Sequence, residues 1–312
     1  VLLGMLILFV LANTDYLRIL NYAYFAYGLN IAALIFLLLF GGERYGARRW
    51  LELGPISLQP SEFVKITIIL ALAFFIGERR ERVEEGKFFI RALLLVAPSI
   101  FLIFLQPDLG TACVLVPIAL SMLFICGARV KHILTVFGMG LLSMPILWHL
   151  LKDYQKNRLM VFLNPDLDPL GAGYTIIQSK IAIGSGGLFG KGWLNGTQSY
   201  LKFLPERHTD FIFSVVGEEW GYVGAVMLIV LYAIIMIRGI KIAEEINDVH
   251  GKVIAIGIVT LIAFQVIVNI SMTIGLMPVV GLPLPAISYG GSNTIVTFIG
   301  AGLLLSVSRR AK

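Results

Sequence analysis

The sequence predicts an all-α polytopic membrane protein. Of its 312 residues, 58% are hydrophobic and only 14% are charged, whereas soluble domains have about 25% charged residues. Apolar runs recur along the chain at close to the length that crosses a bilayer, about 20 residues, and charge, Gly or Pro separates them. A soluble domain and a disordered chain are therefore excluded, and two cysteines exclude a disulfide scaffold.

The chain opens with a short apolar run, Val1–Ala12, which we interpret as the end of a helix whose beginning is missing. Eight predicted spans follow. They lie at about Tyr22–Phe40, Phe63–Ile76, Ala92–Leu105, Leu109–Ile125, Ile133–Leu151, Phe211–Ile237, Val253–Leu276 and Ala286–Val307. We expect residues 1–312 to form a single transmembrane helical domain.

The distribution of Lys and Arg predicts the sidedness of the connections. More than half of the 25 Lys and Arg residues fall in alternate connections, the largest group between Arg79 and Arg91, which the positive-inside rule makes cytoplasmic. The opposite side then carries the segment 152–210, which we expect to be a long, structured extracytoplasmic loop. Because the basic residues are scattered and form no single stripe, nucleic acid is not expected as a partner.

Within this loop, Tyr174–Ile183 predicts a short helix on the membrane face, and the glycine cluster Gly184–Gly192 ends it. The cluster does not match a Walker loop, because Ser185 stands where the first Gly is needed. Two interpretations stay open: a tight turn between short helices, or a turn whose Lys191 meets a phosphate.

The polar cluster Pro205–Asp210 directly precedes a long span. Asp210 or Thr209 could simply cap the helix. Alternatively, Asp210 is a general base at the outer membrane surface, kept ionised by the helix N-terminus and by its neighbours Arg207 and His208.

Other charges lie inside or beside apolar spans, where they need partners. Glu62 and Lys65 are three residues apart and share a helix face, which predicts an ion pair. Glu218 and Glu219 lie about two turns into their span and need partners or a polar cavity. Asp108 occupies a turn on the same predicted side as Asp210.

Cations accumulate on that side of the membrane, which would suit a lipid that carries pyrophosphate. They are Arg48, Arg49, Lys65, Arg158, Lys191 and Arg207. The four His residues are far apart and none pairs with Cys, so a zinc site is not expected. A divalent cation, Mg²⁺ or Mn²⁺, held near Glu62 or Asp108 and by a substrate pyrophosphate, remains open.

Five stretches together resemble the SEDS family, the shape, elongation, division and sporulation proteins that polymerise peptidoglycan. The stretches are GARRWLELGPISLQPSEFVK (46–65), QPDLGTA (106–112), GYTIIQSKIAIGSGGLFGKG (173–192), FLPERHTDFIFSVVGEEWG (203–221) and GLMPVVGLPLPAISYGGSN (275–293). GTQS (196–199) before FLPERHTDF resembles the elongation members more than the division members. The family has ten transmembrane helices, so we expect its first helix and part of its second to be missing here.

The resemblance implies a glycosyltransferase that joins the disaccharide units of lipid II at the outer face of the bacterial cytoplasmic membrane during cell elongation, releasing undecaprenyl pyrophosphate. Asp210 matches the family's essential aspartate. The resemblance leaves Arg48, Lys65, Asp108, Arg158, Lys191, Arg207 and His208 as candidates for substrate binding. It also implies a class B penicillin-binding protein and other membrane proteins of the elongation complex as partners.

Two other functions stay open. Intramembrane charges and Gly- or Pro-broken spans are also typical of a transporter or lipid flippase, although we find no inverted repeat in the sequence. A membrane scaffold that recruits wall enzymes without catalysis is the third possibility.

Overall fold

The computed structural model describes residues 1–42, 49–53, 56–168, 171–200 and 203–311. The chain forms two compact units. Unit 1 comprises Val1–Leu141, Met236–Ile262 and Gly291–Lys312, and unit 2 comprises Leu142–Ile235 and Ala263–Gly290. The prediction of a single domain stays a prediction.

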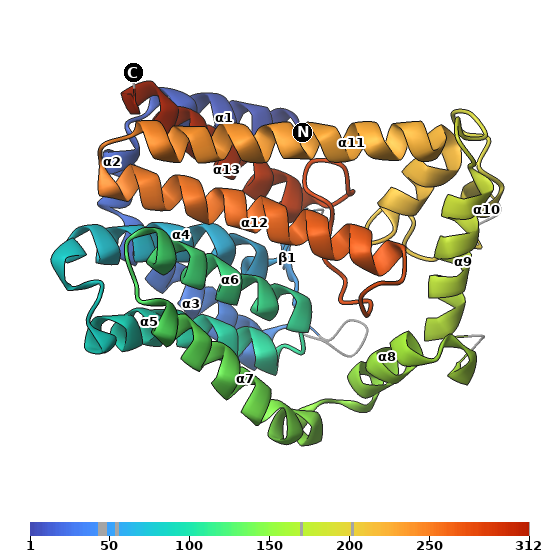
Figure 1. Cartoon of the computed structure of the whole chain (residues 1–312), viewed down its shortest axis with the longest axis horizontal. Coiled ribbons are helices and arrows are strands. Elements are labelled where there is room, and N and C mark those ends of the chain that lie inside the picture. The colour runs from blue at the N-terminus through green and yellow to red at the C-terminus, as the bar shows by residue number, and fades with distance from the viewer. Residues whose placement is uncertain (43–48, 54–55, 169–170, 201–202, 312) are drawn as a thin grey trace. The chain divides into compact units, whose positions relative to one another are not determined.

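Figure 1 shows the course of the chain and labels its elements. The elements of unit 1 are α1 (Leu2–Asn13), α2 (Tyr16–Leu20), α3 (Ala23–Phe40), β1 (Leu51–Leu53), β2 (Ile56–Leu58), α4 (Pro60–Gly77), η1 (Arg80–Arg82), α5 (Gly86–Leu105), α6 (Leu109–Ile125) and α13 (Gly291–Ala311). Those of unit 2 are α8 (Asp153–Leu163), η2 (Pro165–Leu167), α9 (Ala172–Ser185) and α10 (Thr197–Tyr200). Helices α7 (Val130–Leu150), α11 (Ile212–Glu245) and α12 (Val249–Thr273) continue from one unit into the other.

The predicted spans are confirmed as helices. Within the described residues, seven helices are long and apolar enough to cross a membrane, and α1 and α6 are shorter apolar helices. The predicted helix at Tyr174–Ile183 is α9. Helix α13 begins at Gly291 and not at Ala286, because Ala286 adopts a positive φ of 63° and the amides of Ile287 and Ser288 both donate to the carbonyl of Leu284.

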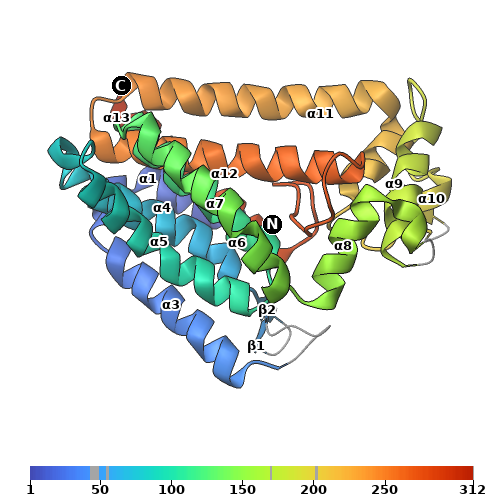
Figure 2. The same cartoon turned by 60° about the horizontal axis from the view of Figure 1, so that its bottom comes forward.

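The elements that were not predicted from the sequence are α2, α8, α10, the short helices η1 and η2, and the hairpin of β1 and β2. The hairpin is antiparallel and pairs Leu51 with Leu58 and Glu52 with Ser57. Figure 2 shows it beside the end of α3. Strands of three residues lie below the length at which alternating hydrophobicity becomes a signal, since that pattern needs about four to eight residues.

Helix α4 is the central helix of unit 1. It contacts α3, α5, α6 and α13, and 72% of its 18 residues are buried. A helix that is apolar all round is typical of such a core position. Helices α1 and α13 pack closely because Gly4 faces the ring of Phe298 and Gly302 faces the backbone of Leu8.

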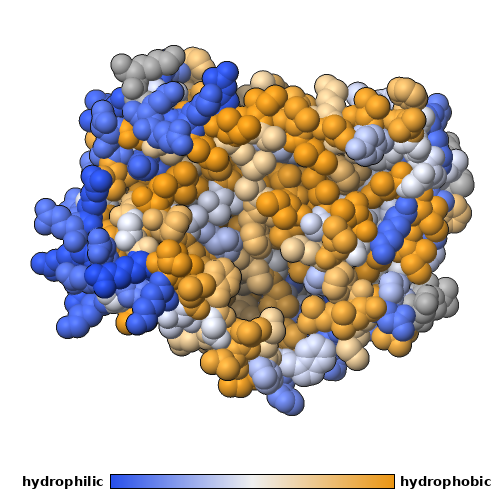
Figure 3. All heavy atoms as spheres, viewed as in Figure 1, coloured by the Kyte–Doolittle hydropathy of each residue, from blue (hydrophilic) through white to orange (hydrophobic). Residues whose placement is uncertain are grey.

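Charged side chains gather at one end of unit 1, over the carboxyl terminus and the connection between α4 and α5 (Figure 3). At this end Asp248 accepts hydrogen bonds from the Tyr16 hydroxyl (2.8 Å) and the Gly251 amide (3.0 Å). Burial opposes the charged form of Asp248, but these bonds and His250 outweigh it and lower the pKa of the carboxyl below its ordinary value. The network ties α2 to the start of α12.

The predicted ion pair of Glu62 and Lys65 is confirmed in the first turns of α4. The Lys65 Nζ lies 2.7 Å from the Glu62 Oε2, and both side chains are buried. Two opposite charges with a short contact compensate much of each other's desolvation, but a single one in the same place would be strongly unfavourable.

We expect Lys65→Met to lower the free energy of unfolding of the protein by about 3–5 kcal/mol, because it leaves Glu62 buried without its cation. The double variant Glu62→Leu, Lys65→Met should lose much less, since neither charge remains. Thermal unfolding of both variants in the same detergent measures the difference. Equal losses in the single and double variants would contradict this account of the pair.

Candidate functional site

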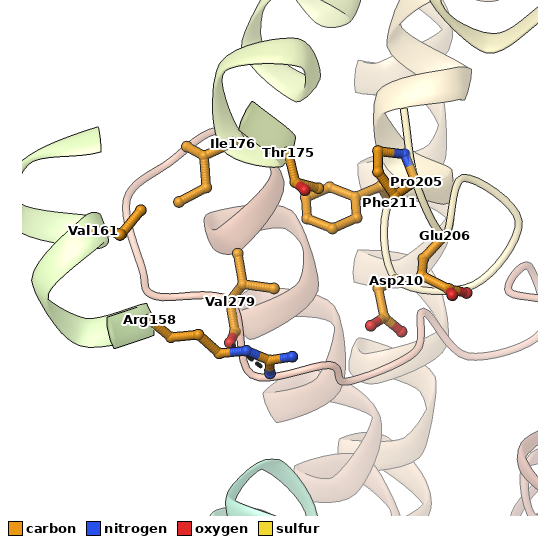
Figure 4. Close-up of a pocket in the computed structure, with 9 residues that line it drawn as sticks. All are labelled: Arg158, Val161, Thr175, Ile176, Pro205, Glu206, Asp210, Phe211 and Val279. Atoms are coloured by element: carbon orange, nitrogen blue, oxygen red, sulfur yellow. Dashed lines mark hydrogen bonds between the residues drawn. The ribbon is translucent and has the colours of Figure 1, made fainter. Parts of the chain in front are cut away.

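A cavity of about 150 Å³ in unit 2 contains Asp210 (Figure 4). Its lining comes from α8, α9, the turn before α11 and the connection after α12. The lining residues are Arg158, Val161, Thr175, Ile176, Pro205, Glu206, Asp210, Phe211 and Val279. On this measure a single water needs about 10–15 Å³, so the cavity can hold several polar groups of a substrate.

A compact turn places Asp210. The amides of Thr209 (3.1 Å) and Phe211 (3.2 Å) both donate to the carbonyl of Glu206. Helix α11 begins at Ile212, and the Phe211 carbonyl accepts its first bond. Asp210 and Thr209 therefore precede Phe211, the residue directly before the helix, and the helix-cap interpretation of these two residues stays a prediction.

Asn269 of α12 holds the backbone of this turn. Its Nδ2 donates to the Asp210 carbonyl (2.9 Å) and to the Leu282 carbonyl (2.7 Å), and its side chain is fully buried. A buried amide that bridges two carbonyls fixes both segments, because breaking either bond leaves a buried polar group without a partner. Asn269 thus connects Asp210 to the connection that follows α12.

That connection is bonded to the same turn at two further points. The Ser288 hydroxyl donates to the Thr209 carbonyl (2.6 Å), and the Tyr289 amide donates to the His208 carbonyl (2.8 Å). The Ser288 oxygen also accepts from the Leu284 amide (2.7 Å). The backbone around Asp210 is therefore held from outside its own segment.

Arg158 supplies the cation of the cavity. It comes from α8, its Nη1 donates to the Val279 carbonyl (3.3 Å), and its guanidinium lies over the Tyr154 ring at 5.8 Å. Figure 4 shows the guanidinium directed toward the side of the cavity that carries Asp210. Val161, Ile176 and Val279 give the cavity an apolar wall, which strengthens electrostatic interactions within it.

Gly281 lies against the carboxylate of Asp210. Its φ is +72°, and a Cβ at this position would lie 3.2 Å from the Asp210 Oδ2. Only glycine adopts this backbone conformation without strain.

Lys191 has a partner within the chain. Its Nζ donates to the Glu218 Oε1 (3.0 Å) and to the Thr197 hydroxyl (2.8 Å). The Glu218 side chain is fully buried, and a carboxylate at this place in a span requires a partner. Lys191 is that partner. The glycine cluster forms the tight turn of the first interpretation, and the phosphate contact of Lys191 stays a prediction.

The remaining candidates lie in two places. Arg207 and His208 are in the Asp210 turn, where the Arg207 Nε lies 3.1 Å from the His208 Nε2. Asp108 and the ion pair Glu62–Lys65 belong to unit 1. Arg48 lies outside the described residues.

Asp108 caps α6 with a carboxylate that several groups of the chain already contact. Its oxygens accept from the Thr111 amide and hydroxyl, from Gln59 Nε2 and from the Ser61 hydroxyl, at 3.0–3.4 Å. The Arg49 Nη1 lies 4.0 Å away. Asp108 therefore has a structural role at the start of α6.

The two carboxylates considered for a metal do not fit a metal centre. Asp108 is surrounded by donors and Glu62 is paired with Lys65. Within the described ranges, no group of three or more His, Cys, Asp or Glu residues could hold a metal ion. A divalent cation in the reaction therefore stays a prediction, and its ligands would include the substrate's phosphates.

Sequence reasoning did not single out Thr175, Ile176 and Val279 of the cavity wall, or Asn269 and Gly281, which lie against Asp210. An Asn in the middle of an apolar span was a usable signal for Asn269, because such residues need buried partners. The wall residues are ordinary apolar ones, and only the fold brings them together.

Gly281→Ala should impair the site without unfolding the protein. We expect a loss of about 1–2 kcal/mol in the free energy of unfolding, because an L-residue at positive φ is strained, and a larger relative loss of activity, because the new methyl crowds Asp210. Gly138→Ala is the matched control, since a Cβ there meets nothing within 4 Å. Equal activity of both variants would contradict the role of Gly281.

Metal ions should not stabilise the substrate-free protein. An ion that binds the folded state raises its stability by mass action, but Glu62 and Asp108 are occupied by donors of the chain. We expect the melting temperature to change by less than about 1 °C between millimolar Mg²⁺ or Mn²⁺ and chelator. A clear increase that Asp108→Asn abolishes would show a preformed metal site and contradict this interpretation.

The model of the FtsW/RodA/SpoVE cell cycle proteins matches residues 1–312. The peptidoglycan glycosyltransferase MrdB of Escherichia coli K12 is 44% identical over 99% of this chain and 84% of its own length. Stage V sporulation protein E of Bacillus subtilis is 38% identical over 99% of this chain and 85% of its own length.

Solved structures agree with the sequence relatives. A chain of a peptidoglycan synthase complex that coordinates polymerization and crosslinking matches with a TM-score of 0.84 and 37% identity, covering 99% of this chain and 87% of its own. RodA, the rod shape determining protein of Thermus thermophilus, matches with a TM-score of 0.71 and 33% identity, covering 98% and 84%. This chain therefore belongs to the FtsW/RodA/SpoVE family of cell cycle proteins, the SEDS proteins that its motifs resemble.

Proposed function

We propose that this membrane protein is a peptidoglycan glycosyltransferase of cell elongation that polymerises lipid II with Asp210 as its general base. The observation that carries the proposal is the cavity in unit 2, in which the Asp210 carboxylate and the Arg158 guanidinium share an otherwise largely apolar lining. The relatives named peptidoglycan glycosyltransferase support the activity.

The reaction needs one base and one site of positive charge. As the acceptor sugar hydroxyl attacks the anomeric carbon of the donor, its proton moves to the Asp210 carboxylate. The bond from the anomeric carbon to the pyrophosphate oxygen breaks, and undecaprenyl pyrophosphate leaves with the bonding electrons. A single displacement inverts the anomeric carbon, so the site needs no second carboxylate as nucleophile.

Arg158 is proposed to stabilise the charge that develops on the leaving pyrophosphate, and its place in the lining of the same cavity supports this role. Arg207 and His208, in the Asp210 turn, are the next candidates for substrate contacts. Lys65, Asp108 and Lys191 are retained as substrate-binding proposals, although each already has a partner in the chain.

The active site is proposed to face the outside of the bacterial cytoplasmic membrane, on the side that the distribution of Lys and Arg assigns to segment 152–210. A class B penicillin-binding protein is the proposed partner, with other membrane proteins of the elongation complex. The similar chain from a complex that coordinates polymerization and crosslinking supports a crosslinking partner.

Asp210→Asn should abolish polymerisation of purified lipid II, with a loss of about 10²-fold or more, because the amide cannot accept the proton. The protein is assayed with its cognate penicillin-binding protein, and glycan strands are measured by gel electrophoresis. Glu206→Gln is the matched control, since Glu206 lines the same cavity and is exposed.

The melting temperature of Asp210→Asn should equal that of the unchanged protein. Polymerisation that survives the substitution would contradict Asp210 as the base. Absence of strands from the unchanged protein in an intact complex would instead favour lipid transport or scaffolding.

A further inference from the structure

The connection between α9 and α10 contains a glycine loop, which we define as Gly186–Asn195. Figures 1 and 2 show this connection beside the amino-terminal part of α11. The Lys191 and Gly192 amides donate to the carbonyls of Glu218 and Glu219, each at 3.0 Å. In return, the amides of Tyr222 (2.9 Å) and Val223 (3.1 Å) donate to carbonyls of the loop.

Two glycines allow this close approach. Helix α11 is interrupted at Gly221, whose φ of 67° and ψ of −162° are not helical. A Cβ on Gly190 would lie 2.1 Å from the Glu219 carbonyl oxygen, and one on Gly221 would lie 2.3 Å from the Gly190 nitrogen. The loop therefore satisfies backbone groups that the interruption of α11 exposes.

The Glu218 carboxylate fixes the loop from inside. It is fully buried, and its Oε1 accepts from Lys191 Nζ (3.0 Å), the Gln198 amide (2.9 Å) and the Thr197 hydroxyl (3.2 Å). A buried carboxylate with three donors is stable only while those donors stay in place. The loop is thus held on α11 as a rigid unit.

This rigid loop directs its largest apolar side chains outward. Phe189 is 81% exposed and Trp193 is 69% exposed, and Leu188 and Leu194 are exposed beside them. Trp193 packs edge-to-face on Trp220 of α11, with ring centroids 6.0 Å apart. Such a patch is unfavourable in water, and nothing in the loop's own packing covers it.

The surrounding helix indicates what covers the patch. From Tyr222 to Ile237, α11 has no charged residue, which corresponds to about 24 Å of helix at 1.5 Å per residue. The hydrocarbon core of a bilayer is about 30 Å thick, so a charge-free run of this length fits within it, with Trp220 and Tyr222 at one end of the run. Trp and Tyr are enriched at the boundary of this core in membrane proteins.

We propose that the glycine loop is a membrane anchor, in which Phe189, Trp193 and Trp220 insert into the interface between lipid head groups and acyl chains. The patch continues the exposed apolar surface of α11, on which Val223 and Met227 are also exposed. Lipid is therefore the occupant that the observations favour. The loop's backbone can enter this region because its amides already have partners on α11.

The anchor has a consequence for the Asp210 cavity. The loop directly follows α9, and α9 supplies Thr175 and Ile176 to the cavity wall. An anchored loop fixes the depth of α9, and with it the depth of the cavity, relative to the bilayer. The proposal itself does not depend on the chemistry at Asp210.

Fluorescence quenching tests the anchor. The chain has four Trp residues, so Trp50→Phe, Trp148→Phe, Trp220→Phe leaves Trp193 as the single emitter. This variant is placed in phosphatidylcholine vesicles that carry bromine either near the head group or near the chain end. We expect head-group-proximal bromine to quench Trp193 about twofold more than terminal bromine, as for a residue at the interface.

A matched control carries its single Trp in a charged connection, by adding Glu81→Trp and Trp193→Phe to the same background. Glu81 is exposed in η1, and brominated lipid should quench the control least. If the single-Trp variant does not fold, Trp193→Phe alone is compared with the unchanged protein. An anchored Trp193 predicts that this substitution removes a measurable share of the emission that brominated lipid quenches.

Absence of quenching by either lipid, with full quenching by aqueous acrylamide, would overturn the proposal. So would protection from both quenchers, which would assign the patch to a protein partner or to a second copy of this chain. If a second copy of this chain covers the patch, the protection should disappear when the amount of protein per vesicle is lowered.

Discussion

A charge or an unpaired backbone group inside an apolar membrane region must find its partner within the protein, and this constraint organises the structure. Glu62 pairs with Lys65 in α4. Glu218 binds Lys191 together with two further donors. The interruption of α11 at Gly221 receives its backbone bonds from the glycine loop. Each of these arrangements compensates a cost that hydrocarbon would otherwise impose.

The same constraint explains the structural carboxylates. A buried carboxylate whose oxygens face the chain's own donors holds its elements in place, as Glu218 and Asp108 do. Asp210 lies outside α11 and lines a cavity with Arg158. Asn269 holds its backbone in place at that cavity. Such preorganisation is what a general base requires.

Local patterns made much of this predictable from the sequence. Apolar runs predicted the spans, and the three-residue spacing of Glu62 and Lys65 predicted their pair. The family motifs singled out Asp210. Contacts between distant segments could not be predicted: Lys191 with Glu218, Asn269 with Asp210, and the meeting of Thr175 and Val279 at one cavity wall. These depend on turn geometry and helix packing, which have no short-range signature. The strands β1 and β2 could not be predicted because three residues are too few for alternating hydrophobicity to be recognised.

The position of the acceptor sugar in a substrate complex tests the central claim most directly. An electron cryo-microscopy structure of the full chain with its penicillin-binding protein partner and lipid II, trapped with Asp210→Asn, would show it. The account predicts an acceptor hydroxyl within hydrogen-bond reach of the side chain at position 210, about 2.6–3.2 Å, and a pyrophosphate near Arg158. A sugar bound in another cavity, with position 210 far from every acceptor hydroxyl, would contradict it.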